Sequence, residues 1–236
     1  MQLLKENTVA EIVSKKLGSD HVFSKYKIDF CCGGGMTLEN ACKESGVEFD
    51  VIKQEIEALN NKITGTLNTN DLDIQSLINQ AKEGYHTSIS EYIFEIAPFA
   101  AKVAEVHGAV HPEIVEINEH FKSVQSVLTE TLKNSLLSLY PIIEEVVEVN
   151  SKQEEIAIEQ LQAFQKVVVR NEIAQKLVGD TFKEISKLSS HYSVPEGACN
   201  SYKFLYEKLH ELEHQVHNYM HFEKNVLIPK VLEIIA

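Results

Sequence analysis

From Asp71 to the end of the chain, apolar residues recur with the three- and four-residue spacing of amphipathic helices. The whole chain of 236 residues holds only 10 glycines and 5 prolines, which favours long helices over many short strands. Pro98 and Pro141 are expected to bend two of these helices. Turn-forming residues divide the stretch into four segments, at about 71–107, 112–149, 154–192 and 198–235. Four long helices with short connections predict a four-helix bundle.

The residues before this stretch predict a small helical domain. Thr8 and Glu11 have the spacing of a capping box at the start of a helix, and Gly18 is expected to end that helix. Further helices are predicted near 21–26, from Thr37 to about Gly46, and over 50–62. The sequence therefore predicts an all-α chain with a helical module at 1–62, a polar linker at 63–70 and the bundle at 71–236.

Composition narrows the class of partner and the compartment. Lys and Arg number 22 against 35 Asp and Glu, and a net charge of −13 argues against nucleic acid as a partner. No run of about 18 apolar residues exists to span a membrane, and the first residues lack the apolar core of a signal peptide. Two of the four cysteines are adjacent, which is a poor layout for a disulfide scaffold. We therefore expect a cytoplasmic protein with free or ligating thiols.

Cys31 and Cys32 are the most unusual local feature, because three glycines follow them directly. Vicinal thiols near a helix N-terminus gain thiolate character, which makes Cys31 and Cys32 candidate reactive thiols. The alternative is that one thiol packs inward and the other has no role. Both interpretations stay open on the sequence alone.

The last predicted helix has two faces of different character. Glu223 falls on an apolar stripe, and a buried carboxylate needs a partner or a metal ion. The alternatives are a Glu hydrogen-bonded inside the bundle or one nearer the surface. A second face carries four histidines and is predicted to be mostly solvated surface, with adventitious metal binding as the alternative: His210, His214, His217 and His221.

Several motifs spread over the chain form one combination. They are Asp29-Phe30-Cys31-Cys32-Gly33-Gly34-Gly35, Leu38-Glu39-Asn40-Ala41-Cys42, His86, Glu105-Val106-His107-Gly108, Leu139-Tyr140-Pro141, Pro195-Glu196-Gly197-Ala198-Cys199 and His221-Phe222-Glu223. With these motifs, the N-terminal part resembles the small module of the repair-of-iron-centres family, and the bundle resembles the hemerythrin-like domain of the same family. The resemblance implies a bundle that holds two irons between His and Glu side chains. It also implies repair of iron–sulfur clusters after oxidative and nitrosative damage, and nitric oxide chemistry.

The family's ligand pattern is only partly present in this sequence. The resemblance places His86 at the first-helix ligand and Glu223 at the bridging glutamate of the fourth helix. At the other four positions the resemblance implies His, Glu, His and His in chain order, but this sequence carries Thr131, Ser135, Gln175 and Tyr219 there. Hydroxyls and an amide supply too little charge for two iron cations. We therefore expect no stable di-iron pair, and either one weakly held divalent ion or a pairing of His86 with Glu223.

Two hypotheses follow for the function. In the first, the protein is a repair or nitric-oxide-handling enzyme of the di-iron type, either with iron ligands at positions other than these six or with a reduced metal site. In the second, it is a metal-poor scaffold, thiol carrier or regulatory partner that acts through Cys31 and Cys32. Whether it is an enzyme is left open, iron–sulfur client proteins are the expected partners, and a homodimer is also left open.

Overall fold

The computed structural model describes residues 3–16, 18–30, 34–59 and 72–235. Every regular element in these ranges is a helix, which confirms the all-α class. None of the described helices has the length and apolar character needed to cross a bilayer. Internal contacts divide the chain into two compact units, Met1–Asn79 with His217–Ala236, and Gln80–Val216. The predicted linker at 63–70 lies outside the described residues, and the domain boundaries 1–62 and 71–236 stay predictions.

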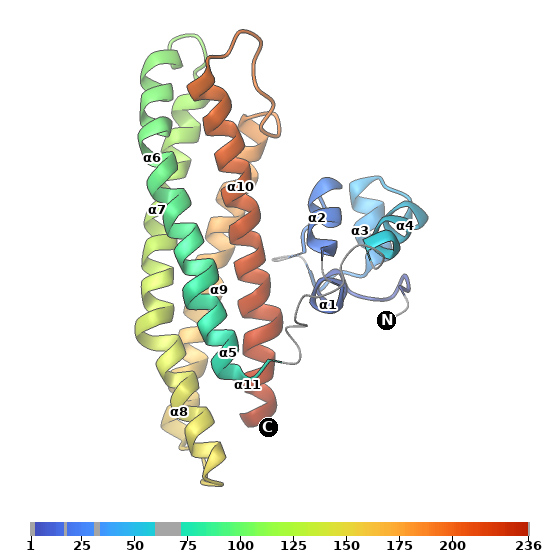
Figure 1. Ribbon diagram of the computed structural model, residues 1–236, viewed down its shortest axis with the longest axis vertical. Helices are drawn as coiled ribbons and strands as arrows, with labels where there is room; N and C mark the ends of the chain where they lie inside the picture. The colour runs from blue at the N-terminus through green and yellow to red at the C-terminus, as the bar shows by residue number, and fades with distance from the viewer. Residues whose placement is uncertain (1–2, 17, 31–33, 60–71, 236) are drawn as a thin grey trace. The chain divides into compact units, whose positions relative to one another are not determined.

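The unit Gln80–Val216 holds the long helices of the bundle. Packing of α7 against α6 and against α9 forms its centre, and Figure 1 shows the long helices running side by side. Fully buried apolar side chains from these helices, including Ile96, Phe121 and Phe182, fill the space between them. The helices are α6 (Thr87–His107), α7 (Glu113–Asn134), α9 (Ile158–Leu188) and α10 (Asn200–Phe222), of which the residues to Val216 belong to this unit.

Three wide turns of π-helix interrupt the long helices: η2 (Gln80–His86), η3 (Ser135–Leu139) and η4 (Glu223–Leu227). Two of them precede a proline by the same interval, since η3 ends two residues before Pro141 and η4 ends two residues before Pro229. Proline has no N–H and its ring crowds the carbonyl four residues earlier, which a wider turn relieves. The chain continues after these turns as α8 (Tyr140–Ser151) and α11 (Ile228–Ile235).

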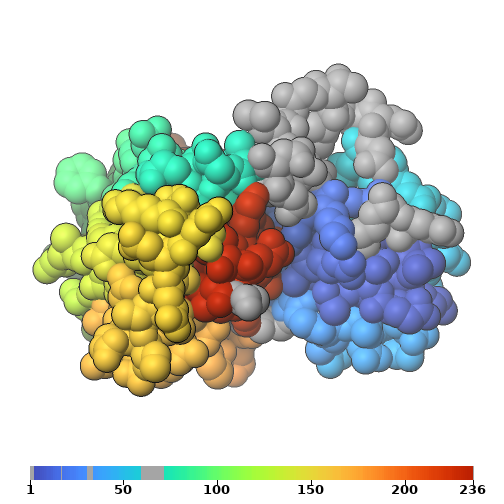
Figure 2. Space-filling model, turned by 90° about the horizontal axis from the view of Figure 1, so that it is seen from below, coloured from blue at the N-terminus to red at the C-terminus, as the bar shows by residue number. Residues whose placement is uncertain are grey.

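The structure corrects two details of the predicted helices. The first long segment was expected to bend at Pro98, but α6 runs through Pro98, and the irregular turn lies at η2, between α5 (Ile74–Asn79) and α6. The third was expected to reach Tyr192, but α9 ends at Leu188. Ser190, His191 and Tyr192 follow with φ values of 50°, 61° and 60°, a left-handed path that cannot continue a right-handed helix. Figure 2 shows α8 and the first turns of α9 side by side at one end of this unit.

Short helices build the N-terminal part of the other unit: α1 (Val9–Lys15), α2 (Ser19–Lys25), α3 (Leu38–Ser45) and α4 (Phe49–Leu59). The Thr8 half of the predicted capping box is confirmed, because the Thr8 hydroxyl accepts a hydrogen bond from Glu11 N at the start of α1. The Glu11 carboxylate accepts from Asn7 Nδ2 and Lys15 Nζ. Thr37 caps α3 in the same way, and the two caps face each other in an isolated bridge. Gly18 was expected to end the first helix, but α1 ends at Lys15 with Lys16 as its C-cap, and Gly18, with a φ of 83°, is the residue before α2.

Candidate functional site

Each π-helical turn holds one of the residues that the resemblance places at a metal ligand position. His86 is the last residue of η2, Ser135 is the first of η3, and Glu223 is the first of η4. Single π-turns inside α-helices occur frequently at functional sites, because the extra residue re-aims the side chains around it. Three of the six positions that the family resemblance implies therefore lie in irregular turns, and the other three lie in regular α-helix.

All six candidate positions are buried. Ser135 is fully enclosed, and the most accessible of the set, Gln175, exposes only 6% of its surface. The apolar stripe predicted around Glu223 is buried as well, from Leu205 to Val226. The helical register inferred from the sequence thus places these side chains in the interior, while their role as a joint metal site stays a prediction.

His86 is held by Tyr140, which follows η3 directly. The His86 Nε2 atom lies 2.8 Å from the Tyr140 hydroxyl, and the two ring centroids are 5.5 Å apart. Burial, together with the positive charge of Lys82, lowers the pKa of His86 to about 4. The imidazole is therefore neutral at pH 7, and it can give or take one proton in the hydrogen bond with Tyr140.

Ser135 and Thr131 are paired through neutral groups. Asn171 Nδ2 on α9 donates to the Ser135 hydroxyl at 3.0 Å, and both residues are buried. The Thr131 hydroxyl donates to the backbone carbonyl of Val127 one turn earlier, at 2.7 Å. Gln175 follows Asn171 by one turn on the same buried face of α9. This part of the interior is therefore a set of hydroxyls and amides rather than a set of charged groups.

Glu223 is the one carboxylate among the candidates. The Tyr219 hydroxyl, one turn earlier, donates to Glu223 Oε1 at 3.0 Å, and both side chains are buried. A hydroxyl that donates to a buried carboxylate offsets part of the cost of burying it. Tyr219 thus occupies an expected ligand position and makes a structural hydrogen bond with its phenol.

Tyr140 and Asn171 are interior residues that the sequence analysis did not select. Tyr140 belongs to the Leu139-Tyr140-Pro141 motif of the family resemblance, so its place in that motif was the available signal. Asn171 lies four residues before Gln175, which puts it on the same helical face. The sequence alone does not show that Tyr140 contacts His86 or that Asn171 contacts Ser135, because each contact joins two different helices.

The donor set does not fit a di-iron centre. Two iron cations need several carboxylate and imidazole ligands, as in other bundles that carry two metals. At four of the expected positions the buried side chains are hydroxyls, an amide and a phenol that carry no charge, namely Thr131, Ser135, Gln175 and Tyr219. Within residues 80–216, all of which the structure describes, no three His, Cys, Asp or Glu side chains lie close enough to share one ion.

The histidine face of α10 is less uniform than predicted. His210 is exposed, but His221 is buried, so the expectation of a solvated surface is wrong at that position. His221 Nδ1 lies 3.3 Å from the backbone carbonyl oxygen of Phe30, and its Nε2 lies 3.4 Å from the Ser14 hydroxyl. The sequence pattern of α10 alone did not reveal this, because it was the N-terminal residues that covered His221.

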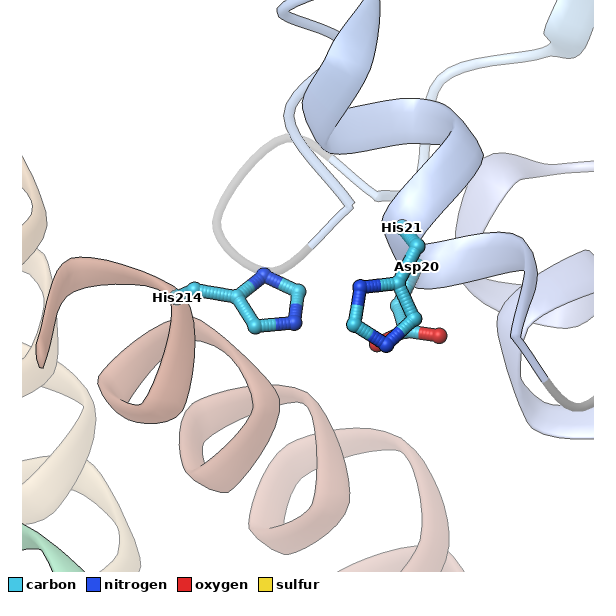
Figure 3. Close-up of side chains that lie close together, drawn as sticks. All are labelled: Asp20, His21 and His214. Atoms are coloured by element: carbon cyan, nitrogen blue, oxygen red, sulfur yellow. The ribbon is translucent and has the colours of Figure 1, made fainter. Parts of the chain in front are cut away.

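Other titratable side chains lie outside this interior. Asp20 and His21 are neighbours on α2, where His21 Nε2 is 3.8 Å from Asp20 Oδ2, and His214 projects from α10 (Figure 3). Burial raises the pKa of Glu213, also on α10, to about 7, against the opposing effects of Tyr192, His214 and Lys183. Glu213 is therefore a group whose charge changes near neutral pH.

The cysteines differ in their surroundings. Cys31 and Cys32 lie outside the described residues, so their role as reactive thiols stays a prediction. Cys42 is buried in α3, and burial raises the pKa of its thiol. Cys199 is exposed just before α10, and its Sγ lies 3.3 Å from Nε2 of His107.

Comparison with known proteins decides the family. A family model named ScdA_N, described as a domain of unknown function (DUF542), matches residues 5–60. The iron-sulfur cluster repair protein ScdA of Staphylococcus haemolyticus is 30% identical over 231 residues, covering 95% of this chain and 97% of that protein. The chain belongs to the iron–sulfur cluster repair family. This confirms the family resemblance found in the sequence.

Two other relatives also match most of this chain. The ScdA protein of Staphylococcus epidermidis is 25% identical, over 97% of this chain and 99% of that protein. The iron-sulfur cluster repair protein YtfE of Yersinia pseudotuberculosis is 26% identical, over 89% of this chain and 90% of that protein. The match to the repair family therefore runs through both the N-terminal module and the bundle.

Proposed function

We propose that this protein takes part in the repair of damaged iron–sulfur clusters, and that it does so without a di-iron pair in its bundle. The single observation that supports a bundle without a di-iron pair is the uncharged, hydrogen-bonded set of side chains at four of the family's ligand positions. Ser135 accepts from Asn171, Thr131 donates to a backbone carbonyl, and the Tyr219 phenol donates to Glu223. Satisfied polar groups of this kind stabilise a bundle without metal.

Cys31 and Cys32 are the groups that we propose to act on the damaged client. A thiolate is a nucleophile and a good ligand for iron, and two adjacent thiols can hold or pass an iron ion that a neutral interior cannot. Such thiols work in a compartment that keeps them reduced, which suits a protein of the cytoplasm. The clients would be iron–sulfur proteins, as the names of the relatives state for those relatives.

A non-catalytic scaffold is the second candidate function. The same neutral interior supports it, because a bundle without strong metal ligands still offers a stable framework for binding a client. The two functions differ in one respect: a scaffold binds the damaged client and leaves its cluster unrepaired, whereas a repair protein restores it.

A reactivation assay separates the two. A purified dehydratase that carries a [4Fe–4S] cluster is damaged with peroxide and then incubated with this protein, ferrous iron and a thiol reductant. We expect faster recovery of dehydratase activity than with iron and reductant alone, and loss of that gain in the Cys31→Ser and Cys32→Ser variants. Cys199→Ser, which changes an exposed cysteine elsewhere, is the matched control and should keep the gain. Recovery at the same rate with and without the protein would contradict the repair function.

A further inference from the structure

A thiol and an imidazole lie side by side where two long helices of the bundle meet. Cys199 directly precedes α10, His107 is the last residue of α6, and both belong to the unit Gln80–Val216. Cys199 Sγ lies 3.3 Å from His107 Nε2, which is within hydrogen-bonding distance for sulfur. A nucleophile with a base in hydrogen-bonding reach is the arrangement that activates cysteine side chains. The buried candidate positions described above do not include this pair.

The two helix ends favour transfer of the thiol proton to the imidazole. Because α6 ends at His107, the partial negative charge of its C-terminus stabilises an imidazolium there. The backbone carbonyl of Cys199 accepts hydrogen bonds from Tyr202 N and Lys203 N, both at 3.1 Å, so Cys199 stands at the N-terminus of α10. The partial positive charge of that terminus stabilises a thiolate. Both helix ends therefore favour the form of cysteine that attacks disulfides.

The imidazole has a fixed neighbour, and the thiol is open to solvent. The ring of Tyr202 is buried, and it meets the ring of His107 edge-on with the centroids 5.5 Å apart. Cys199 is exposed. Cys42, by contrast, is buried in α3, where burial raises the pKa of its thiol. Of these two described cysteines, Cys199 is therefore the one that combines access with a nearby proton acceptor.

We propose that Cys199 and His107 form a thiol–disulfide exchange site, at which Cys199 takes up a small thiol from a low-molecular-weight disulfide. His107 Nε2 accepts the thiol proton, and the Cys199 thiolate attacks one sulfur of the disulfide. A new S–S bond forms to Cys199, the old S–S bond breaks, and the other half leaves as a thiolate that takes the proton from His107. One disulfide and one thiol are consumed and one of each is formed, so the step needs no further oxidant.

A small disulfide suits this site because it needs no docking surface to reach an exposed thiol. The mixed disulfide is a reversible cap, and it keeps the thiol from oxidation to acids that cannot be reduced again. The proposal is independent of the repair function assigned to Cys31 and Cys32. The thiol reductant in the reactivation assay keeps Cys199 uncapped, so the Cys199→Ser control there is unaffected.

Timed exposure of the full chain to 2-hydroxyethyl disulfide at pH 7, followed by peptide mass spectrometry, tests the proposal. Cys199 should form the mixed disulfide about tenfold faster in the folded chain than in the chain unfolded in urea. His107→Gln keeps a polar side chain but removes the base, and it should slow the folded chain about tenfold. His111→Gln is the matched control, because the ring of His111 also meets Tyr202 edge-on while its Nδ1 pairs with Glu113 Oε1 at 2.9 Å. This variant should keep the wild-type rate.

Four outcomes would overturn the proposal. The first is a Cys199 that reacts no faster in the folded than in the unfolded chain, a comparison that needs no substitution. The second is an unchanged rate in His107→Gln, and the third is an equal loss of rate in His111→Gln, with circular dichroism verifying that both variants are folded. The fourth is an adduct that an excess of dithiothreitol does not release, because exchange is reversible.

Discussion

The N-terminal helices and the bundle interior use polar side chains in opposite ways. In the N-terminal part, the hydroxyls of Thr8 and Thr37 lie at helix starts, where they satisfy backbone N–H groups that have no helical partner. In the bundle, Ser135, Asn171 and Thr131 lie in the middle of long helices and are buried among apolar residues. Polar groups at helix ends are explained by the fold, whereas polar groups in the middle of a core need another explanation.

This contrast between polar groups at helix starts and polar groups in the core indicates where a lost or altered metal site lies. A bundle of this length could be filled with apolar residues alone, and burying a polar side chain has a cost unless it is paired. Three of the buried polar residues at the family's expected ligand positions, His86, Ser135 and Glu223, lie in the π-helical turns. We propose that the backbone geometry of a ligand-bearing bundle persists, while Thr131, Ser135, Gln175 and Tyr219 have replaced four of its six ligands and Glu223 keeps its carboxylate.

The largest loss in the free energy of unfolding is expected for a substitution in the apolar core, and the polar substitutions below are compared with it. Phe182 is fully buried in α9, and Phe182→Ala should lower the free energy of unfolding by about 3–5 kcal/mol, because it leaves a cavity. Chemical denaturation followed by circular dichroism measures it. A loss below about 1 kcal/mol would mean that the bundle core is not packed as described.

The buried pair of Ser135 and Asn171 tests whether the polar interior is structural. Asn171→Leu removes the donor to the Ser135 hydroxyl and should cost about 1–3 kcal/mol in the free energy of unfolding. Adding Ser135→Ala should recover part of that loss, because the hydroxyl no longer needs that partner. Additive losses in the double variant would show that the two side chains are not coupled.

Glu213 gives a prediction that depends on pH. Its pKa rises from 4.5 to about 7 on folding, so the carboxylate destabilises the folded state above pH 7, and this penalty fades as pH falls toward 4.5. Glu213→Gln should therefore raise the free energy of unfolding at pH 8 by roughly 1–3 kcal/mol and by much less at pH 5. An equal effect at both pH values would show that the carboxyl is not buried.

The smallest effect is expected at the helix caps of the N-terminal part. Thr8→Ala removes the acceptor for Glu11 N and should cost about 1 kcal/mol. Amide hydrogen exchange is the suitable measurement, because the loss should appear as faster exchange in the first turn of α1. Unchanged protection there would indicate that Thr8 does not cap the helix.

Much of the fold could be predicted from the sequence, because its signals are local. The cap at Thr8, the interruption before Pro141 and the buried stripe through Glu223 follow from spacing and from the chemistry of single residues. The burial of His221 and the hydrogen bond between His86 and Tyr140 depend on contacts between residues far apart in the chain. Helical periodicity carries no information about those partners, which is why the candidate site was found only in outline.

The iron content of the bundle tests the central claim most directly. Purified protein is incubated anaerobically with ferrous iron, desalted and assayed for iron, beside a variant that carries Thr131→His, Ser135→Glu, Gln175→His and Tyr219→His. The wild type should retain well under two irons per chain, and the variant should retain about two, because it regains the family's imidazole and carboxylate ligands. Retention of about two irons by the wild type, with an oxo-bridge absorption band on exposure to air, would contradict the account.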